Sequence, residues 1–178
     1  NGLPALIIGE PGTGKAMLSH LMFDYGINEG ILPSKATYIA IDCADYISDD
    51  ERFANDLLGT KSHLGHLNKV SGGIVYLADF ECLSQVSRNL IFTHLRHTTD
   101  PSHDTPVTPS ARIVLSTSLP PNDLIIRQIT HLVPIVVNVP SLKERTGDER
   151  ADLVMHFLRI EGRHVASDVA ISRGALRS

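Results

Sequence analysis

One short glycine-rich motif constrains this chain more than any other feature. An apolar run, residues 3–8, leads into the sequence GEPGTGKA, and a segment of helical period starts at Lys15. This is the GxxxxGK pattern, in the strand-before and helix-after context that a phosphate-binding loop requires. The glycines let backbone N–H groups turn toward a phosphate, and the helix N-terminus adds a partial positive charge. The predicted nucleotide-binding residues are Gly9, Glu10, Pro11, Gly12, Thr13, Gly14, Lys15 and Ala16.

Two residues of the motif determine its expected chemistry. Lys15 supplies a mobile positive charge for the β and γ phosphates of a nucleotide. Ala16 stands where Ser or Thr usually provides a hydroxyl ligand for Mg²⁺, which a methyl group cannot do. The expected cofactor is therefore ATP or ADP, with Mg²⁺ bound less firmly because water must replace the hydroxyl.

The rest of the chain alternates apolar runs with segments of helical period, which is typical of an α/β domain with a parallel sheet. Strands are predicted at residues 3–8, 37–42, 74–78, 112–116 and 133–139. Four helices are predicted. The first spans residues 15–28, the second follows Ser48 as its N-cap, the third spans residues 83–97, and the fourth starts at Thr146. In the first helix, Met17, Leu18, Leu21 and Met22 are expected near one face. The predicted fold is a three-layer P-loop NTPase, with helices on both faces of a parallel sheet.

Composition excludes several classes of function. The net charge of −4, from 16 Lys and Arg against 20 Asp and Glu, argues against extensive phosphate contacts with nucleic acid. Cys43 and Cys82 make no disulfide framework, which favours a reducing compartment and a cytoplasmic location. No apolar run approaches 18 residues, so no membrane span is expected. The first residue is Asn1, which suggests a piece of a longer protein.

A P-loop enzyme also needs carboxylates at the end of a neighbouring strand, one for the metal and one for the attacking water. The candidate sequence is IVYLADFE, where Ala78 and Asp79 stand at the positions of the usual Asp-Glu pair. Asp79 is thus the one carboxylate expected at the strand tip, with Glu81 two residues on. Asp79 can serve as the Mg²⁺ ligand or as the catalytic carboxylate, but hardly as both.

Four stretches in order carry a resemblance to a known family. They are GEPGTGK at residues 9–15, YGINEGILPSKATYIAIDCADY at 25–46, KVSGGIVYLADFECLS at 69–84, and VPIVVNVPSLKERTGDERADLVMHFLRIEGR at 133–163. Together they resemble the AAA+ central domain of bacterial sigma-54-dependent transcription activators. They are most similar to the branch that carries phosphotransferase-system regulatory domains and controls sugar operons.

The resemblance implies an organisation and partners. Residues 1–140 would form the AAA+ nucleotide-binding core, and residues 141–178 the beginning of a helical lid. A family member of this kind would form a homo-oligomer, act on sigma-54 RNA polymerase and bind DNA through another domain. Many members have Glu after the P-loop lysine, so Ala16 alone does not argue against ATP binding.

The chain departs from the family at the parts needed for hydrolysis and partner contact. Residues 58–68 are too short for the GAFTGA-type loop that touches sigma-54, and they contain no such motif. The paired arginines of the finger region are absent, and Arg127 is the nearest guanidinium. At the sensor position of the fourth strand, hydroxyls remain at Thr117 and Ser118. An arginine finger is worth a factor of roughly 10³ to 10⁵ in rate, so little hydrolysis is expected without one.

These observations give three hypotheses. The first is an ATP-binding AAA+ domain of a sugar-operon regulator, with weakened or absent ATP hydrolysis. The second is a competent ATPase that drives activation of sigma-54 RNA polymerase. The third is a small-molecule P-loop kinase, which would need lid arginines and an intact metal site. Enzymatic activity is thus open, because the Walker B pair, the finger and the sigma-contact loop all depart from the family.

Overall fold

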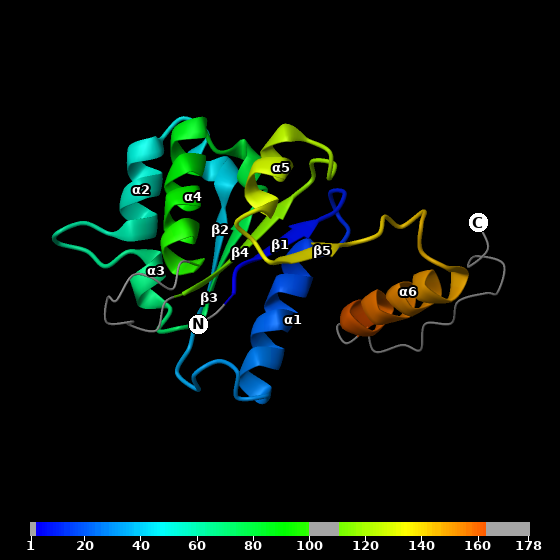
Figure 1. Ribbon diagram of the computed structural model, residues 1–178. Coiled ribbons are helices and arrows are strands. Elements are labelled where there is room, and N and C mark those ends of the chain that lie inside the picture. The colour runs from blue at the N-terminus through cyan, green and yellow to red at the C-terminus, as the bar shows by residue number, and fades with distance from the viewer. Residues whose placement is uncertain (1–2, 100–110, 163–178) are drawn as a thin grey trace. The chain divides into compact units, whose positions relative to one another are not determined.

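The computed structural model describes residues 3–99 and 111–162, and the chain divides into two compact units, residues 1–139 and 140–178 (Figure 1). Residues 163–178 of the predicted lid lie outside the described residues. In the first unit the strands are β1 (Ala5–Ile8), β2 (Tyr38–Asp42), β3 (Ile74–Ala78), β4 (Arg112–Thr117) and β5 (Ile135–Asn138). Its helices are α1 (Lys15–Asn28), α2 (Asp50–Leu58), α3 (His66–Lys69), α4 (Gln85–Thr99) and α5 (Leu124–Thr130), with short 3-10 turns η1 (Cys43–Tyr46) and η2 (Phe80–Cys82). The second unit contains α6 (Gly147–Gly162).

The five strands form one parallel sheet in the order β2-β3-β4-β1-β5. β1 is therefore an inner strand, between β4 and the edge strand β5, and all strands end at the same edge of the sheet. Since ligands of open α/β sheets bind at the carboxyl ends of the strands, this edge is where a site is expected. The loop that follows β1 leaves the sheet there, next to the tip of β4.

Helices cover both faces of the sheet, as predicted. One face carries α1, and Figure 1 shows it opposite the side that holds α2, α4 and α5. Alternate strand residues serve the two layers: Leu6 and Ile8 pack with the α2, α4 and α5 side, whereas Ala5 and Ile7 pack with the α1 side. The expected three-layer α/β architecture is confirmed.

The buried face of α1 differs from the predicted one. Leu18 and Met22 pack against the sheet, but Met17 and Leu21 are 46% and 53% exposed. The predicted face was rotated away from the buried one: the buried side of α1 contains Ser19 and Gly26, and Met17 and Leu21 lie on the opposite side of the helix. The Ser19 hydroxyl meets the Tyr38 hydroxyl of β2 at 2.6 Å.

The start of α2 is also one residue later than its predicted cap. Asp49, not Ser48, is the N-cap residue, and its carboxylate accepts a hydrogen bond from Arg52 N at 3.1 Å. Both residue types cap helices well, so the sequence alone did not discriminate between them. The short helices α3 and α5 were not predicted, because four and seven residues are too few for a periodic signal.

Candidate phosphate-binding site

The GEPGTGKA loop turns from β1 into α1 through two left-handed glycines. Gly12 has φ +80° and Gly14, the N-cap of α1, has φ +93°, conformations that other residues adopt at a cost. Gly9 is needed for a different reason, since an added Cβ would lie 3.0 Å from Val139 O beside the loop. No side chain caps α1. The first hydrogen bond within the helix is that from Leu18 N to Gly14 O, so the backbone N–H groups before Leu18 have no partner inside the helix. The backbone thus has the form that receives an anion.

Lys15 lies folded back into this loop. Its side chain is only 8% exposed, and Nζ donates to Gly9 O at 2.9 Å, Glu10 O at 3.1 Å and Ser118 Oγ at 3.0 Å. An ammonium group has three donors, and all three are used. Asp79 Oδ1 lies 3.9 Å from Nζ, which is a weak ion pair because the Asp79 side chain is 48% exposed. A phosphate that reaches Lys15 must therefore replace one of these internal partners.

The tip of β4 holds the two candidate sensor hydroxyls in different places. Thr117 is fully buried, and its Oγ1 accepts a hydrogen bond from Leu119 N at 3.0 Å. Ser118 points its hydroxyl to Lys15 instead. Gly9 N also donates to Thr117 O at 3.1 Å, so the P-loop and the β4 tip are joined through main chain as well as side chain. Of the two predicted residues, the structure brings Ser118 to the P-loop lysine.

The tip of β3 supplies the predicted carboxylate in a strained backbone turn. Asp79 adopts the left-handed conformation, φ +47° and ψ +54°, which is uncommon for a residue other than glycine. Its amide donates to Ser116 Oγ of β4 at 3.3 Å, which fixes the turn against the neighbouring strand. This places the Asp79 carboxylate near Lys15, as the sequence predicted for a strand-end acid. Ala78, before it, contributes no ligand atom.

Two predicted residues do not contact this cluster. Ala16 lies exposed in the first turn of α1 and offers no hydroxyl for a metal. Arg127 lies in α5 with an exposed side chain, and within residues 3–99 and 111–162 no hydrogen bond or ion pair of its guanidinium is found. Arg127 is thus not part of the cluster around Lys15 in this chain.

Glu81 is a residue of the cluster to which the sequence gave no role. It lies in η2, just after Asp79, and its Oε1 accepts a hydrogen bond from Ser118 N at 2.8 Å. Its Oε2 is buried and has no hydrogen-bond partner. A carboxylate two residues beyond a strand-end acid was the available signal, but its direction depends on the η2 turn, which sequence periodicity does not reveal.

Residues 59–65, within the segment expected to be too short for a sigma-contact loop, form a tight, closed turn. Gly59 and Leu64 form an antiparallel bridge, and Thr60 N donates to His63 O at 2.8 Å. Gly59 and Gly65 approach so closely that a Cβ on Gly65 would lie 2.2 Å from the carbonyl carbon of Leu58. This geometry leaves no room in the turn for an inserted loop without reopening it.

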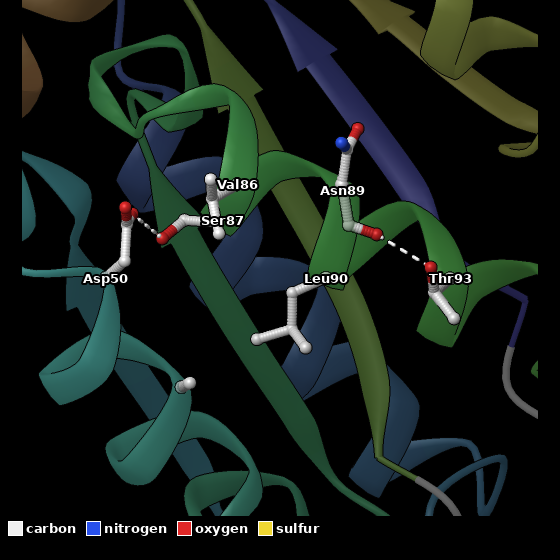
Figure 2. A pocket seen from close by; sticks show the side chains of 7 residues that line it. Asp50, Val86, Ser87, Asn89, Leu90 and Thr93 are labelled. Atoms are coloured by element: carbon white, nitrogen blue, oxygen red, sulfur yellow. Dashed lines mark hydrogen bonds between the residues drawn. The ribbon is translucent and has the colours of Figure 1, made fainter.

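A cavity of about 310 Å³ lies between α2 and α4 and is lined by residues of those helices alone (Figure 2). Asp50 accepts hydrogen bonds at 2.5 Å from the hydroxyls of Ser84 and Ser87, which lie at the start of α4. These two bonds lower the pKa of Asp50, and the bond from Ser84 has the larger effect. Val86 and Leu90 give the cavity an apolar wall. None of its lining residues belongs to the P-loop cluster.

Comparisons with known proteins agree with this architecture. No protein-family model matches the chain. The transcriptional regulatory protein LevR of Bacillus subtilis (strain 168) is 23% identical over 185 residues, which covers 96% of this chain and 20% of LevR. The transcriptional regulatory protein DagR of Salmonella typhimurium (strain 14028s) is 22% identical over 190 residues, covering 99% of this chain and 20% of DagR. The chain thus spans about a fifth of the length of these relatives.

Solved structures show the same fold. NtrX from Brucella abortus in complex with ATP superposes with a TM-score of 0.73 at 22% identity, over 99% of this chain and 42% of NtrX. The NtrX complex with ADP gives a TM-score of 0.71, again at 22% identity, over 98% of this chain and 40% of NtrX. Hsp104 with ATPγS and casein gives 0.63 at 12% identity, over 92% of this chain and 32% of Hsp104. The fold is that of an AAA+ P-loop NTPase.

This result confirms the fold class predicted for the chain. The predicted resemblance to a divergent AAA+ domain of bacterial transcription regulators is confirmed as well, since both relatives are transcriptional regulatory proteins. None of the helices in residues 3–99 and 111–162 has the length and hydrophobicity of a transmembrane segment.

Proposed function

We propose that this AAA+ domain is the nucleotide-binding module of a bacterial transcription regulator and hydrolyses ATP slowly or not at all. The observation that carries the proposal is that the phosphate-binding residues of the site are present while most of its expected catalytic residues are replaced. The phosphate-binding parts are intact, with Gly12 and Gly14 left-handed and Lys15 at the loop. The catalytic parts are reduced to Asp79, since Ala16 and Ala78 offer no ligand for a metal.

The residues present fit a nucleotide. The uncapped start of α1 and the Lys15 ammonium provide the donors that β and γ phosphates accept. Residues 9–16 are the proposed nucleotide contacts, and Ser118 is the proposed sensor. When bound, Mg²⁺ would neutralise phosphate charge, and Asp79 is the side chain placed to hold it through water. Asp79 is the one side chain proposed as a metal ligand, so weak metal binding is expected.

The whole protein's role follows from its relatives as a proposal. LevR and DagR are transcriptional regulatory proteins of which this chain covers a fifth. A cytoplasmic homo-oligomer that binds DNA through another domain and regulates a sugar operon fits this kinship. Contact with sigma-54 RNA polymerase is proposed to be altered, because the turn at Gly59 and Gly65 is closed. Arg127 is the guanidinium proposed to act on a neighbouring subunit's nucleotide, since it is exposed on α5.

The test measures binding and hydrolysis together on the full chain. Equilibrium titration with ATP and ADP is combined with a phosphate-release assay, using wild type, Lys15→Ala and the control Lys35→Ala, an exposed loop lysine. We expect binding in the wild type and the control, at least a tenfold loss in Lys15→Ala, and release well below about 1 s⁻¹. Equal binding by Lys15→Ala would refute a functional P-loop. Turnover of about 1 s⁻¹ or more would favour a competent ATPase instead.

A further inference from the structure

Glu81 connects three structural elements at the edge of the sheet. Its main-chain carbonyl accepts a hydrogen bond from Arg88 Nη1 of α4 at 3.1 Å, and Arg88 Nη1 also donates to Leu83 O at 2.6 Å. Its side chain reaches the β4 tip, where Oε1 accepts from Ser118 N at 2.8 Å. The η2 turn therefore accepts a hydrogen bond from α4 through the Glu81 carbonyl and a second one from the β4 tip through the Glu81 side chain.

Ser118 is bound at both its ends. The amide is held by Glu81, and the hydroxyl accepts from Lys15 Nζ at 3.0 Å. Because a serine hydroxyl rotates freely about one bond, the position of its backbone decides which groups it can meet. The Glu81 hydrogen bond holds that backbone from the η2 side, in addition to the bonds that Thr117 makes with Gly9 N and Leu119 N.

The second oxygen of Glu81 makes this arrangement costly. Oε2 is enclosed and has no hydrogen-bond partner, and burying an ionisable group with so few partners opposes folding. Packing alone does not require a carboxylate here, since an apolar side chain would fill the space without that cost. The contact that Glu81 does make, with Ser118 N, is the one that reaches the P-loop lysine.

We propose that Glu81 is a positioning residue that sets the preference of this site for ATP over ADP by holding Ser118. The inference rests on the proposed function, because it needs a nucleotide at Lys15. When the terminal phosphates draw Lys15 away from its internal partners, Glu81 keeps the Ser118 hydroxyl in place. A phosphate oxygen bound to Nζ then lies close to Ser118 Oγ, which can donate to the terminal phosphate that ADP lacks.

The test is a cycle of variants titrated separately with ATP and with ADP on the full chain. Glu81→Ala removes the acceptor, Glu81→Gln keeps an oxygen for Ser118 N without the charge, and Ser118→Ala removes the hydroxyl. Glu29→Ala, at the exposed far end of α1, is the matched control. Thermal unfolding of each variant reports its folding, and the readout is the ratio of ATP affinity to ADP affinity.

We expect Glu81→Ala and Ser118→Ala each to lower this ratio about five- to tenfold, the loss typical of one hydrogen bond. Glu81→Gln and Glu29→Ala should stay within about twofold of wild type, and Glu81→Ala combined with Ser118→Ala should be no worse than Ser118→Ala alone. A Glu81→Gln ratio as low as that of Glu81→Ala would overturn the proposal, as would additive losses in the double variant. If Glu81→Ala fails to fold, Glu81→Met, which fills the space without offering an acceptor to Ser118 N, takes its place and should lower the ratio equally; an unchanged ratio in Glu81→Met would overturn the proposal.

The two proposals fail in different ways. A wild type that binds neither nucleotide removes the proposed function and this inference with it. A wild type that binds both through Lys15, while Glu81→Ala leaves the ratio unchanged, removes this inference alone.

Discussion

Replacing Lys15 should destabilise this protein even when no nucleotide is present. A P-loop lysine is expected to serve the ligand, but here the Lys15 side chain is 8% exposed and its ammonium donates to three oxygen atoms of the protein. Lys15→Met keeps much of the length of the side chain and removes the charge and the donors. The carbonyl oxygens of Gly9 and Glu10, and the hydroxyl of Ser118, would then lose their partner.

The magnitude follows from competing terms. Hydrogen bonds from a charged group contribute about 1.5–3 kcal/mol each, but burial of the ammonium costs several kcal/mol, which offsets much of their sum. The Asp79 pair at 3.9 Å contributes at most about 1 kcal/mol, less in salt, because that carboxylate is half exposed. The net loss expected is about 1–3 kcal/mol, the cost of leaving buried acceptors unsatisfied. For a chain of this size each kcal/mol lowers Tm by roughly 2–4 °C.

The assay is chemical and thermal unfolding of nucleotide-free protein, with Lys35→Met as the matched control. Lys35 lies exposed in the loop between α1 and β2, so its replacement should change stability by less than about 0.5 kcal/mol. An unliganded Lys15→Met variant as stable as Lys35→Met would refute the folded-back lysine. It would also mean that Lys15 is free in solution to meet a phosphate without exchanging partners.

Three further outcomes are expected. The hydrogen bonds from Ser84 and Ser87 lower the pKa of Asp50 below its ordinary 3.8, so the stabilising contribution of this carboxylate is complete above that pH and is lost as pH falls through the lower folded-state pKa. The difference in unfolding free energy between wild type and Asp50→Asn, measured by urea unfolding, should therefore shrink as pH falls through the acidic range. A difference that stays constant would contradict this. Gly73→Ala should destabilise by about 1–3 kcal/mol or more in the same assay, since the new Cβ would lie 2.0 Å from a carbonyl oxygen of the residue before β2. Burial raises the pKa of the Cys43 thiol, with nearby carboxylates adding to the effect, so native protein at pH 8 should protect Cys43 from iodoacetamide until it unfolds, as mass spectrometry of the labelled peptide would show.

The sequence predicted the elements that have a strong local signal. The five strands are apolar runs, of which β1, β3 and β4 are buried. Helix α1 has the predicted bounds of residues 15–28, because a left-handed glycine starts it and a long periodic segment follows. The same local information failed for the buried face of α1, where Met17 and Leu21 are exposed. Which side of α1 is buried depends on its contacts with the sheet, such as that between the hydroxyls of Ser19 and Tyr38 of β2, and not on the spacing of apolar residues alone.

The site shows the same division between local and long-range information. The loop could be read from its residues because a GxxxxGK turn is a contiguous motif. The cluster around it could not, since Ser118 lies 103 residues from Lys15 and reaches it only because the strand order places β4 beside β1. The role of Glu81 is still harder to predict from sequence, because its contact with Ser118 also depends on the left-handed turn at Asp79. The sequence thus predicts the candidate phosphate-binding loop, whereas the contact between Glu81 and Ser118 follows only from the fold.

The internal hydrogen bonds of Lys15 affect how tightly this site can bind a nucleotide. The ammonium is satisfied without a ligand, so the loop keeps its shape when empty, and a phosphate gains only the difference between its own contacts and those it replaces. An intact metal site would add to that difference, but Ala16 and Ala78 contribute nothing to it. Affinity should therefore be modest and depend on few contacts, and each remaining contact carries a larger share of the discrimination between nucleotides. In such a site the hydroxyl of Ser118 matters more than it would beside a full set of metal ligands and an arginine finger, and so does the carboxylate of Glu81 that holds it.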